Sequence, residues 1–430
     1  MSIIRSMSIG AAGLRAHTEA LGAVGDNIAN VNTVGYKRER AIFEDVLGRS
    51  VAGGNSIAIS GAGSRMAHIE SMWTQGALMT TDAPTDLAVS GDGLFIVNGN
   101  VDGVTGSFYT RAGQFSIDEG GFLVNPDGLR LQGYPADETG ALSATLGDLR
   151  VTGTTIPATP TAAVDLAVSL DANAPVLAAP WDPLDPAATS NFATSVTVYD
   201  SLGNAHESTV YFRKTAAGAW DWHAMVDGAE VAGGTPGVPE EGGTGTLAFD
   251  TTGALTADAG ASTWDFVGAT AGQAITFDFG TSIAEGGTGL DGSTGLAGAS
   301  HVVALQQDGF AGGSVSGLRI EADGNITGVF SNGQLRTLGA VALADFASVD
   351  GLARTGHNLW SESRESGEPL VGAPGSGGLG AIVAGALEGS NVDLGTEFVD
   401  LIAYQRGFSA NSRIITTADE MYQELVSLKR

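Results

Sequence analysis

The chain has no cysteine in its 430 residues. Disulfides, thiolate zinc sites and cysteine nucleophiles are therefore excluded, and stability must come from packing and hydrogen bonding. Uncharged apolar runs are also short. None approaches the roughly 20 residues that a membrane-spanning helix needs. We expect no membrane insertion and, because no basic segment followed by an apolar one opens the chain, no cleavable signal peptide.

Basic residues are few and unevenly placed. Against 48 acids there are 20 bases, giving a net charge of −28, which disfavours nucleic acid and anionic surfaces as partners. Residues 1–50 carry six bases and five acids, and residues 391–430 carry four and six, so the middle holds 10 bases and 37 acids. This distribution suggests shielded ends and a solvent-facing middle, although an ordinary soluble surface in the middle would give it too.

Catalytic and cofactor motifs are scarce. The chain has neither a phosphate-binding G-x-x-x-x-G-K-[ST] loop nor a G-x-S-x-G elbow, and its six histidines are too scattered for a metal set. The G-x-G-x-x-G match at 375–380 follows Pro374, without a clear strand, and fits a connector. Trp220 and Trp222 fit either a sugar-binding patch or a strand covering a small sheet. We expect no enzyme activity, cofactor or metal.

Heptad patterns occupy both ends of the chain. Large apolar residues recur every seven positions, with a second set three residues later, as in helices packed lengthwise. Because the chain leaves through one helix and returns through the other, antiparallel pairing is the simplest prediction; separate local cores are the alternative. Asp393 is the expected N-cap of the second helix. The two seams comprise Met7, Leu14, Leu21 and Ile28 with Gly10, His17, Val24 and Val31, and Leu401, Phe408, Ile415 and Tyr422 with Tyr404, Asn411, Ala418 and Leu425.

Glycine is abundant, with 64 residues. Gly10, Gly13, Gly22 and Gly25 lie inside the first predicted helix, and each costs about 1 kcal/mol relative to alanine. This cost of roughly 4 kcal/mol predicts a helix that forms only when neighbours pack against it.

The middle of the chain is predicted to be β-structure. Ser195–Tyr199 and Ser208–Phe212 flank a turn at 200–204, and Leu318–Glu321 and Ile326–Phe330 flank another, as expected for hairpins. The segments 153–190 and 231–300 are rich in Gly, Ala, Thr and Pro, which predicts long surface loops and domain seams.

The motifs at the two ends resemble those of the flagellar axial proteins, the rod and hook families. The N-terminal motif is residues 21–37, LGAVGDNIANVNTVGYK, and the C-terminal ones are residues 387–394, LEGSNVDL, and 405–413, QRGFSANSR. Residues 86–95 and 109–115 are similar to a β-domain common to both families, while Ser195–His206 resembles an element of the hook protein's outer domain. Asp26 stands where these families usually have asparagine. Asn30–Thr33, Arg38 and Phe43–Asp45 are more similar to the distal rod version.

The resemblance implies a structural subunit of the flagellar hook, the flexible universal joint between rod and filament, located outside the cell. Its implied partners are many copies of itself, the distal rod, hook cap and hook–filament junction proteins, and the type III export apparatus. The alternatives are a distal rod protein with an inserted domain and, in a different class, a secreted β-rich adhesin or glycan-binding module. The residues expected to carry self-assembly are Met7, Leu14, Leu21, Val24, Asn27, Ile28, Asn30, Leu401, Tyr404, Phe408, Asn411, Ile415, Tyr422 and Leu425.

The expected fold is α+β and multidomain, with discontinuous N- and C-terminal helices forming a coiled-coil-like pair and two mostly-β domains inserted between them. We expect residues 1–75 with 375–430 to form the terminal assembly domain. Residues 76–150 with 300–374 form the expected inner β domain, and 151–299 the outer β domain.

Overall fold

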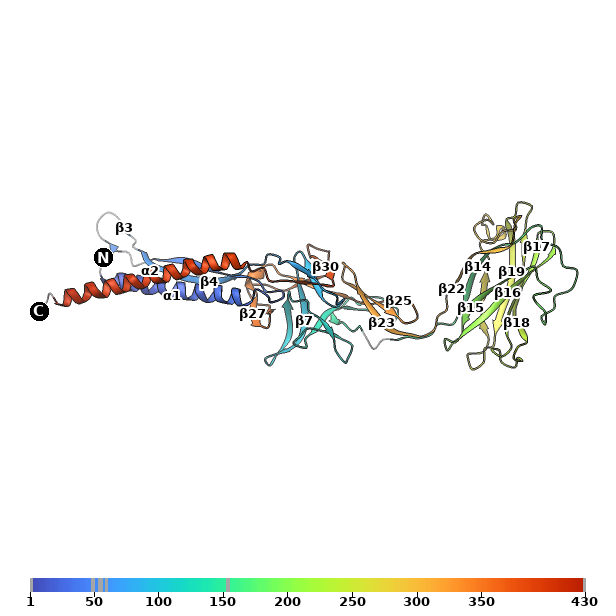
Figure 1. The fold of residues 1–430 in the computed structure, drawn as a ribbon, viewed down its shortest axis with the longest axis horizontal. Helices are drawn as coiled ribbons and strands as arrows, with labels where there is room; N and C mark the ends of the chain where they lie inside the picture. The colour runs from blue at the N-terminus through green and yellow to red at the C-terminus, as the bar shows by residue number, and fades with distance from the viewer. Residues whose placement is uncertain (1–2, 48–50, 53–56, 59–60, 152–154, 428–430) are drawn as a thin grey trace. The chain divides into compact units, whose positions relative to one another are not determined.

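The computed structural model describes residues 3–47, 51–52, 57–58, 61–151 and 155–427 (Figure 1). The chain divides into two compact units. Unit 1 comprises Met1–Gly153, Ser316–Val329 and Leu335–Arg430, and unit 2 comprises Thr154–Val315 and Phe330–Gln334. The expected start of the outer domain, residue 151, adjoins residues 152–154, which lie outside the described residues.

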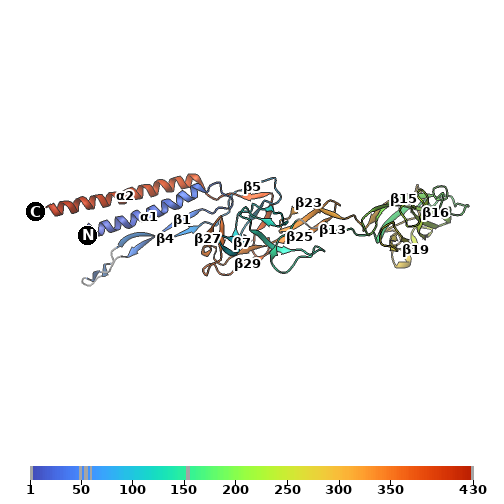
Figure 2. The same cartoon turned by 90° about the horizontal axis from the view of Figure 1, so that it is seen from below.

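Unit 1 begins and ends with a long helix. Helix α1 spans Ile3–Ala29 and helix α2 spans Leu394–Ser427. They run side by side in opposite directions (Figures 1 and 2), which confirms the predicted pairing. Asp393 caps α2 as predicted, because its Oδ1 accepts a hydrogen bond of 2.7 Å from the Thr396 amide.

A long antiparallel hairpin packs against α1. It consists of β1 (Glu39–Leu47) and β4 (Gly61–Ser71), and short strands β2 (Val51–Ala52) and β3 (Ile57–Ala58) pair between them in the chain. A Cβ placed on Gly63 of β4 would lie 3.5 Å from the Ala12 Cβ of α1. Helix α1 is therefore covered on one side by α2 and on another by the hairpin.

The rest of unit 1 is β-structure. Its main sheet has the order β24-β25-β11-β7-β8-β28-β27, with β9, β10, β12, β26 and β29 joined to its members, and the pairs β30–β6 and β31–β5 lie outside it. The bounds are β5 Leu78–Thr80, β6 Leu87–Ser90, β7 Leu94–Val101, β8 Val104–Thr110, β9 Ser116–Ile117, β10 Leu123–Val124, β11 Arg130–Pro135, β12 Gly147–Asp148, β24 Asn325–Phe330, β25 Leu335–Val341, β26 Leu343–Asp345, the 3₁₀ turn η2 Val349–Gly351, β27 Ala353–Gly356, β28 Leu359–Ser361, β29 Leu370–Gly372, β30 Ala381–Ala384 and β31 Ala386–Glu388.

Unit 2 is built mainly from a six-stranded antiparallel sheet and a three-stranded sheet. The larger sheet has the order β15-β16-β17-β18-β19-β20 and the smaller β21-β14-β22. The bounds are β13 Thr155–Ile156, β14 Ala163–Ser169, β15 Phe192–Tyr199, β16 Ala205–Ala216, β17 Ala219–Asp227, β18 Pro239–Phe249, β19 Leu255–Trp264, β20 Gln273–Ala274, β21 Thr276–Asp278, the 3₁₀ turn η1 Ile283–Glu285, β22 His301–Gln307 and β23 Gly313–Ile320, which holds the boundary between the units.

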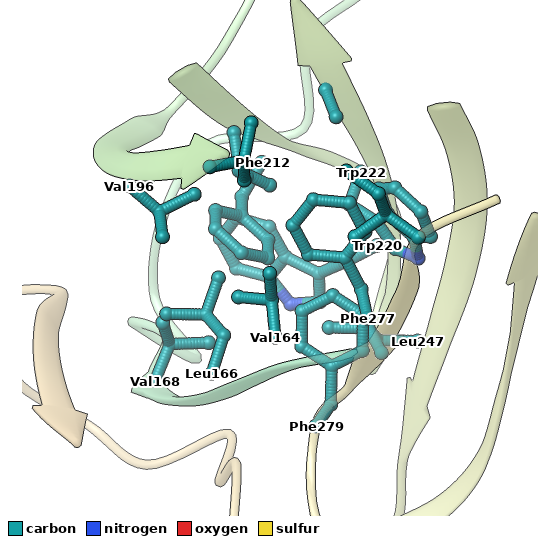
Figure 3. Packing of buried hydrophobic residues seen from close by; sticks show 14 of the residues in the cluster. Val164, Leu166, Val168, Val196, Phe212, Trp220, Trp222, Leu247, Phe277 and Phe279 are labelled. Carbon is teal, nitrogen blue, oxygen red and sulfur yellow. The ribbon is translucent and has the colours of Figure 1, made fainter. Parts of the chain in front are cut away.

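One apolar core fills unit 2. Alternate residues of β14, β16 and β17 point into it, including Leu166, Phe212 and Trp222 (Figure 3). Trp220 and Trp222 are 1% and 2% exposed. The predicted hairpin at 200–204 is confirmed by the pairing of β15 with β16. The alternative of a glycan-binding patch is wrong for these tryptophans, because neither indole reaches the surface.

The prediction of loops throughout 153–190 and 231–300 is wrong where β14, β18 and β19 lie. Glycines in β18 and β19 make room for indole rings rather than ending strands. A Cβ on Gly245 would lie 2.5 Å from Trp222 Nε1, and one on Gly242 would lie 2.2 Å from Trp264 Cε3. These small residues are required by close packing, and sequence composition alone does not distinguish that role from a turn.

One hairpin turn recurs in both units. In each copy an Asp or Asn oxygen accepts hydrogen bonds from the amides two and four residues later, and a glycine at the third following position has a φ between +79° and +88°. The side chain thus replaces backbone hydrogen bonds that the turn leaves unmade. Among the described residues, copies of this turn begin at Asn125, Asp137, Asp200 and Asp250.

Candidate assembly interface

The contact between α1 and α2 is made possible by glycines. A Cβ on Gly10 would lie 3.0 Å from Ile415 Cγ1, and one on Gly13 would lie 2.8 Å from Asn411 Oδ1. On the other helix, a Cβ on Gly407 would lie 2.5 Å from His17 Nε2. The cost of these glycines in a helix is therefore offset by close approach of the two backbones.

The most buried face of α1 consists of small residues. Ala16, Ala20, Ala23, Val24 and Asn27 are all buried, at spacings of three and four residues. The larger side chains, which were predicted to form the contact between the helices, lie beside this face. This is because α1 lies between α2 and the hairpin β1–β4. Met7, Leu14, Leu21, Ile28 and Asn30 are half-buried, as are Leu401, Tyr404, Phe408, Asn411 and Ile415, whereas Tyr422 and Leu425 are exposed. The role of these residues in self-assembly stays a prediction.

Three aromatic rings meet where α1, α2 and β1 converge. The ring centroids of His17, Phe43 and Tyr404 lie 5.7 to 6.1 Å apart. This spacing is typical of favourable aromatic contacts, so the cluster fixes the middle of the helix pair against the hairpin.

Near the last turn of α1 and the first turn of α2, Asn27 joins three segments. Its amide nitrogen donates to the Glu39 carbonyl at 2.7 Å and to Glu397 Oε2 at 3.1 Å. Its oxygen accepts from the Glu39 amide at 2.8 Å and from the Tyr36 hydroxyl at 3.2 Å. Arg38 adds ion pairs to Glu397 and Asp400 of α2. Asn27 is fully buried, so each of these bonds is made in place of a bond to water.

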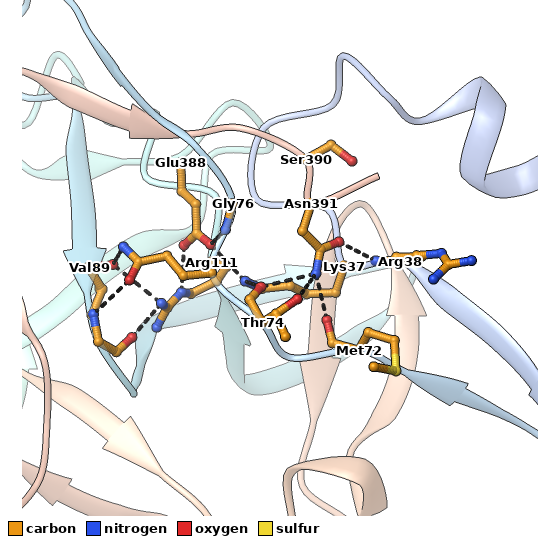
Figure 4. A network of polar contacts seen from close by, with 12 residues as sticks. Lys37, Arg38, Met72, Thr74, Gly76, Val89, Arg111, Glu388, Ser390 and Asn391 are labelled. Carbon is orange, nitrogen blue, oxygen red and sulfur yellow. Dashed lines mark hydrogen bonds and ion pairs between the residues drawn. The ribbon is translucent and has the colours of Figure 1, made fainter. Parts of the chain in front are cut away.

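A buried ion network connects the terminal segments to the adjoining β-structure (Figure 4). The Glu388 carboxylate accepts hydrogen bonds from Lys37 Nζ at 2.7 Å, Arg111 Nε at 2.7 Å and the Gly76 amide at 2.8 Å. Both cations also donate to backbone carbonyls, Lys37 to Thr74 at 2.9 Å and Arg111 to Gly91 at 2.6 Å. All polar atoms at the centre are thus satisfied, as burial of charge requires.

Asn391 makes further hydrogen bonds beside the ion network. Its amide nitrogen donates to the carbonyls of Met72 at 2.7 Å and Thr74 at 3.0 Å, and its oxygen accepts from the Arg38 amide at 2.6 Å. Residues that follow α1 and residues that precede α2 are therefore held by one continuous set of bonds.

The electrostatics of the network follow from burial and pairing. Burial alone would raise the pKa of Glu388, but the charges of Arg111 and Lys37 and the hydrogen bonds from Lys37 and Gly76 lower it below its ordinary value. Burial lowers the pKa of Lys37, and Glu388 opposes that effect. Glu388 is therefore a carboxylate at neutral pH, and it balances buried positive charge.

Sequence reasoning did not assign Lys37, Arg111 and Glu388 to a site, although all three lie in the motifs that carry the family resemblance. One signal was available, since Glu388 ends the otherwise uncharged apolar stretch 381–387. A lone acid at the end of such a stretch suggests a buried, paired carboxylate. Its two partners could not be identified, because they are far away in the sequence.

Within the described residues, neither α1 nor α2 is both long and apolar enough to cross a membrane. In the same part of the chain, no group of three or more His, Asp or Glu side chains is arranged to hold a metal ion.

Four protein-family models match the chain and place it among the flagellar rod and hook proteins. Residues 7–37 match the flagella basal body rod protein and residues 383–428 the C-terminal part of the flagellar basal body rod FlgEFG proteins. Residues 88–173 match the D1 domain of flagellar hook proteins FlgE/F/G, and residues 169–310 the flagellar basal body protein FlaE D2 domain. Both helices and both units contribute to these matches.

Curated relatives narrow the assignment. The chain is 36% identical to the flagellar hook protein FlgE of Treponema pallidum, with 100% of each chain covered. It is 34% identical to those of Borreliella burgdorferi and Salmonella typhimurium, with 99% of this chain and 100% of each relative covered. The chain belongs to the flagellar hook protein FlgE family. The preference for hook over distal rod, made on Ser195–His206, is confirmed.

Proposed function

We propose that the chain is the subunit that polymerises into the flagellar hook, the curved tube that works as a universal joint between rod and filament. The observation that carries this proposal is full-length similarity, at 34–36% identity, to proteins named flagellar hook protein. The role is mechanical and needs neither catalysis nor a cofactor.

The geometry of unit 1 supports a mechanical role. A polymer that bends while it transmits torque needs a firm connection between the segments that assemble and the rest of each subunit. The Lys37–Glu388–Arg111 network and the hydrogen bonds of Asn27 and Asn391 supply such a connection. Separating buried polar groups whose hydrogen bonds are all made costs a large free energy.

We assign the parts of the chain as follows. Residues 1–75 with 375–430 form the inner tube and 76–150 with 316–374 an inner β domain. The outer β domain, expected at 151–299, continues through β22 to Val315, because β22 pairs with β14; its contacts slide as the tube bends. Partners beyond other copies are the distal rod, hook cap and hook–filament junction proteins. Delivery is by the flagellar type III export apparatus, without a cleavable signal peptide.

Substitutions in the helix pair test this function. Leu21→Asp and Phe408→Asp each place a charge beside the packed helices, and we expect both variants to lose polymer formation in sedimentation and electron microscopy. Val104→Asp is the control, because Val104 is 63% exposed in unit 1 and is far in sequence from both helices. Polymers of normal length from both helix variants would contradict the assignment of the helices to the inner tube.

A further inference from the structure

The outward side of α2 carries a regular stripe of small and basic residues. Its members are exposed and recur at spacings of three and four residues, so they lie on one helix face. Neither guanidinium in the stripe makes a hydrogen bond or ion pair with the described part of the chain, and a shallow hollow lies between Ile402, Arg406, Ala410 and Arg413. The stripe consists of Ala403, Arg406, Ala410, Arg413 and Thr417.

The outward side of α1 carries a matching stripe of small and acidic residues. Glu19, Gly22, Asp26 and Ala29 are exposed and follow the same three- and four-residue spacing. Within the described residues, neither carboxylate has a hydrogen-bond or ion-pair partner. The acids of α1 are seven residues apart, and so are the bases of α2, about 10.5 Å along a helix in both cases.

The glycines of α1 supply a second reason to expect a partner on this side. Gly10 and Gly13 face α2 so closely that a Cβ would meet its atoms, whereas a Cβ on Gly22 or Gly25 would have nothing within 4 Å. Each of the latter glycines costs about 1 kcal/mol in a helix, and no contact within the described part of the chain requires them. Close approach by a helix from outside the chain would require them.

We propose that the α2 stripe of one copy docks on the α1 stripe of a second copy. In the antiparallel register set by the charges, Glu19 faces Arg413 and Asp26 faces Arg406. The small residues then coincide, with Gly22 opposite Ala410 and Ala29 opposite Ala403. Arg15, one turn before Glu19, falls opposite Thr417 and meets no base. This inference rests on the proposed function and specifies which helix faces join the copies.

The contact is of the kind that builds a polymer. Within the chain α1 and α2 are already antiparallel, so an α1–α2 contact between copies joins molecules that point the same way. Each copy then keeps one unused stripe, and such a heterologous contact extends indefinitely or closes only after a full turn. The inner faces that hold Gly10 and Gly13 remain occupied within each chain.

Charge exchange between the stripes tests the proposal. Arg406→Glu with Arg413→Glu gives a chain with acids on both stripes, and Glu19→Arg with Asp26→Arg gives one with bases on both. Each variant alone should lose polymer about tenfold or more in sedimentation and electron microscopy, because like charges would meet. A one-to-one mixture should recover polymer, because every contact between unlike variants again joins acid to base.

Controls separate this proposal from the proposed function. Arg319→Glu with Arg364→Glu changes the net charge equally on exposed residues outside both helices and should polymerise normally. Wild-type protein that forms no polymer would count against the proposed function. Polymer from either reversed variant alone, or none from the mixture while wild type polymerises, would overturn the stripe contact.

A disulfide test gives an independent readout, since the chain has no cysteine of its own. Gly22→Cys with Ala410→Cys should give a ladder of covalent oligomers after oxidation, because the register places these positions opposite each other. The variant with Gly22→Cys alone should give at most dimers. Absence of the ladder in samples that contain polymer would reject the register.

Discussion

Glu388 Oε1 lies 2.7 Å from Lys37 Nζ across 351 residues of sequence, and both side chains are almost completely buried. Each residue adjoins one of the terminal helices, and Arg111 of the β-structure binds the same carboxylate. A subunit of the flagellar hook family thereby couples its helix pair to its β-structure through one acid.

Replacing that acid should be costly. Glu388→Gln leaves two buried cations without a counter-charge, so we expect a loss of about 3–5 kcal/mol in the free energy of unfolding of unit 1. Urea denaturation measures it. Glu70→Gln is the matched control, because the Arg40–Glu70 pair is partly exposed to solvent and should contribute about 0–1 kcal/mol. Equal effects of the two substitutions would show that the network does not hold the terminal segments to the β-structure.

Lowering the pH should destabilise the fold through particular carboxyl groups. The pKa of Glu388 is lowered by Arg111 and Lys37 against the effect of burial, and the pKa values of Asp137 and Asp250 are lowered by hydrogen bonds within their turns. A lowered carboxyl pKa gives stability that is present above the ordinary value and is lost as pH falls through the folded value. We therefore expect stability to decline below about pH 4.5.

The turns offer a matched variant for this pH effect. Asn125 already fills the same place as Asp137, so Asp137→Asn should keep the turn's acceptor while removing a titrating group. Denaturation curves between pH 7 and pH 3 should then show a shallower acid-induced loss for the variant. An unchanged slope would mean that the Asp137 turn does not contribute to it.

Replacement of two helix glycines by alanine should have different effects on stability. Gly22→Ala adds a methyl group in open space and should stabilise α1 by about 0.5–1 kcal/mol. Gly13→Ala should give no such gain, because the new Cβ would displace Asn411, whose amide donates to the Gly407 carbonyl at 3.0 Å. Thermal unfolding followed by circular dichroism measures both, and equal gains would contradict the packing described for the helix pair.

Strand glycines in unit 2 should be intolerant of side chains. In Gly245→Ala the added Cβ would lie 2.0 Å from the Ala259 carbonyl oxygen and 2.5 Å from Trp222 Nε1, so we expect a loss of about 1–3 kcal/mol in unit 2 stability. Gly106→Ala in β8 is the control, because a Cβ there would have nothing within 4 Å. Tryptophan fluorescence during urea denaturation follows both variants.

Local patterns predicted a large part of this fold. The heptads located both helices, Asp393 marked the start of α2, and turn residues at 200–204 marked a hairpin. Each of these signals depends on residues close together in the chain, where spacing and turn chemistry act directly.

The remaining features depend on contacts that local patterns do not contain. Gly242 and Gly245 suggested loops, because their role is to accommodate indoles from other strands. The buried face of α1 was expected at its largest apolar residues, but Ala16 and Ala20 occupy it, since elements on two sides leave room only for small side chains. The ion pair between Lys37 and Glu388 could be identified only in the folded chain, because the two residues are far apart in the sequence.

Electron microscopy of concentrated full-length protein tests the central claim most directly. If the chain is a hook subunit, wild-type protein forms hollow curved tubes, and the Leu21→Asp and Phe408→Asp variants remain monomeric with their β-structure intact. If wild-type protein instead stays monomeric at high concentration, or the helix variants form the same tubes, the account of the terminal helices as the polymerising element is contradicted.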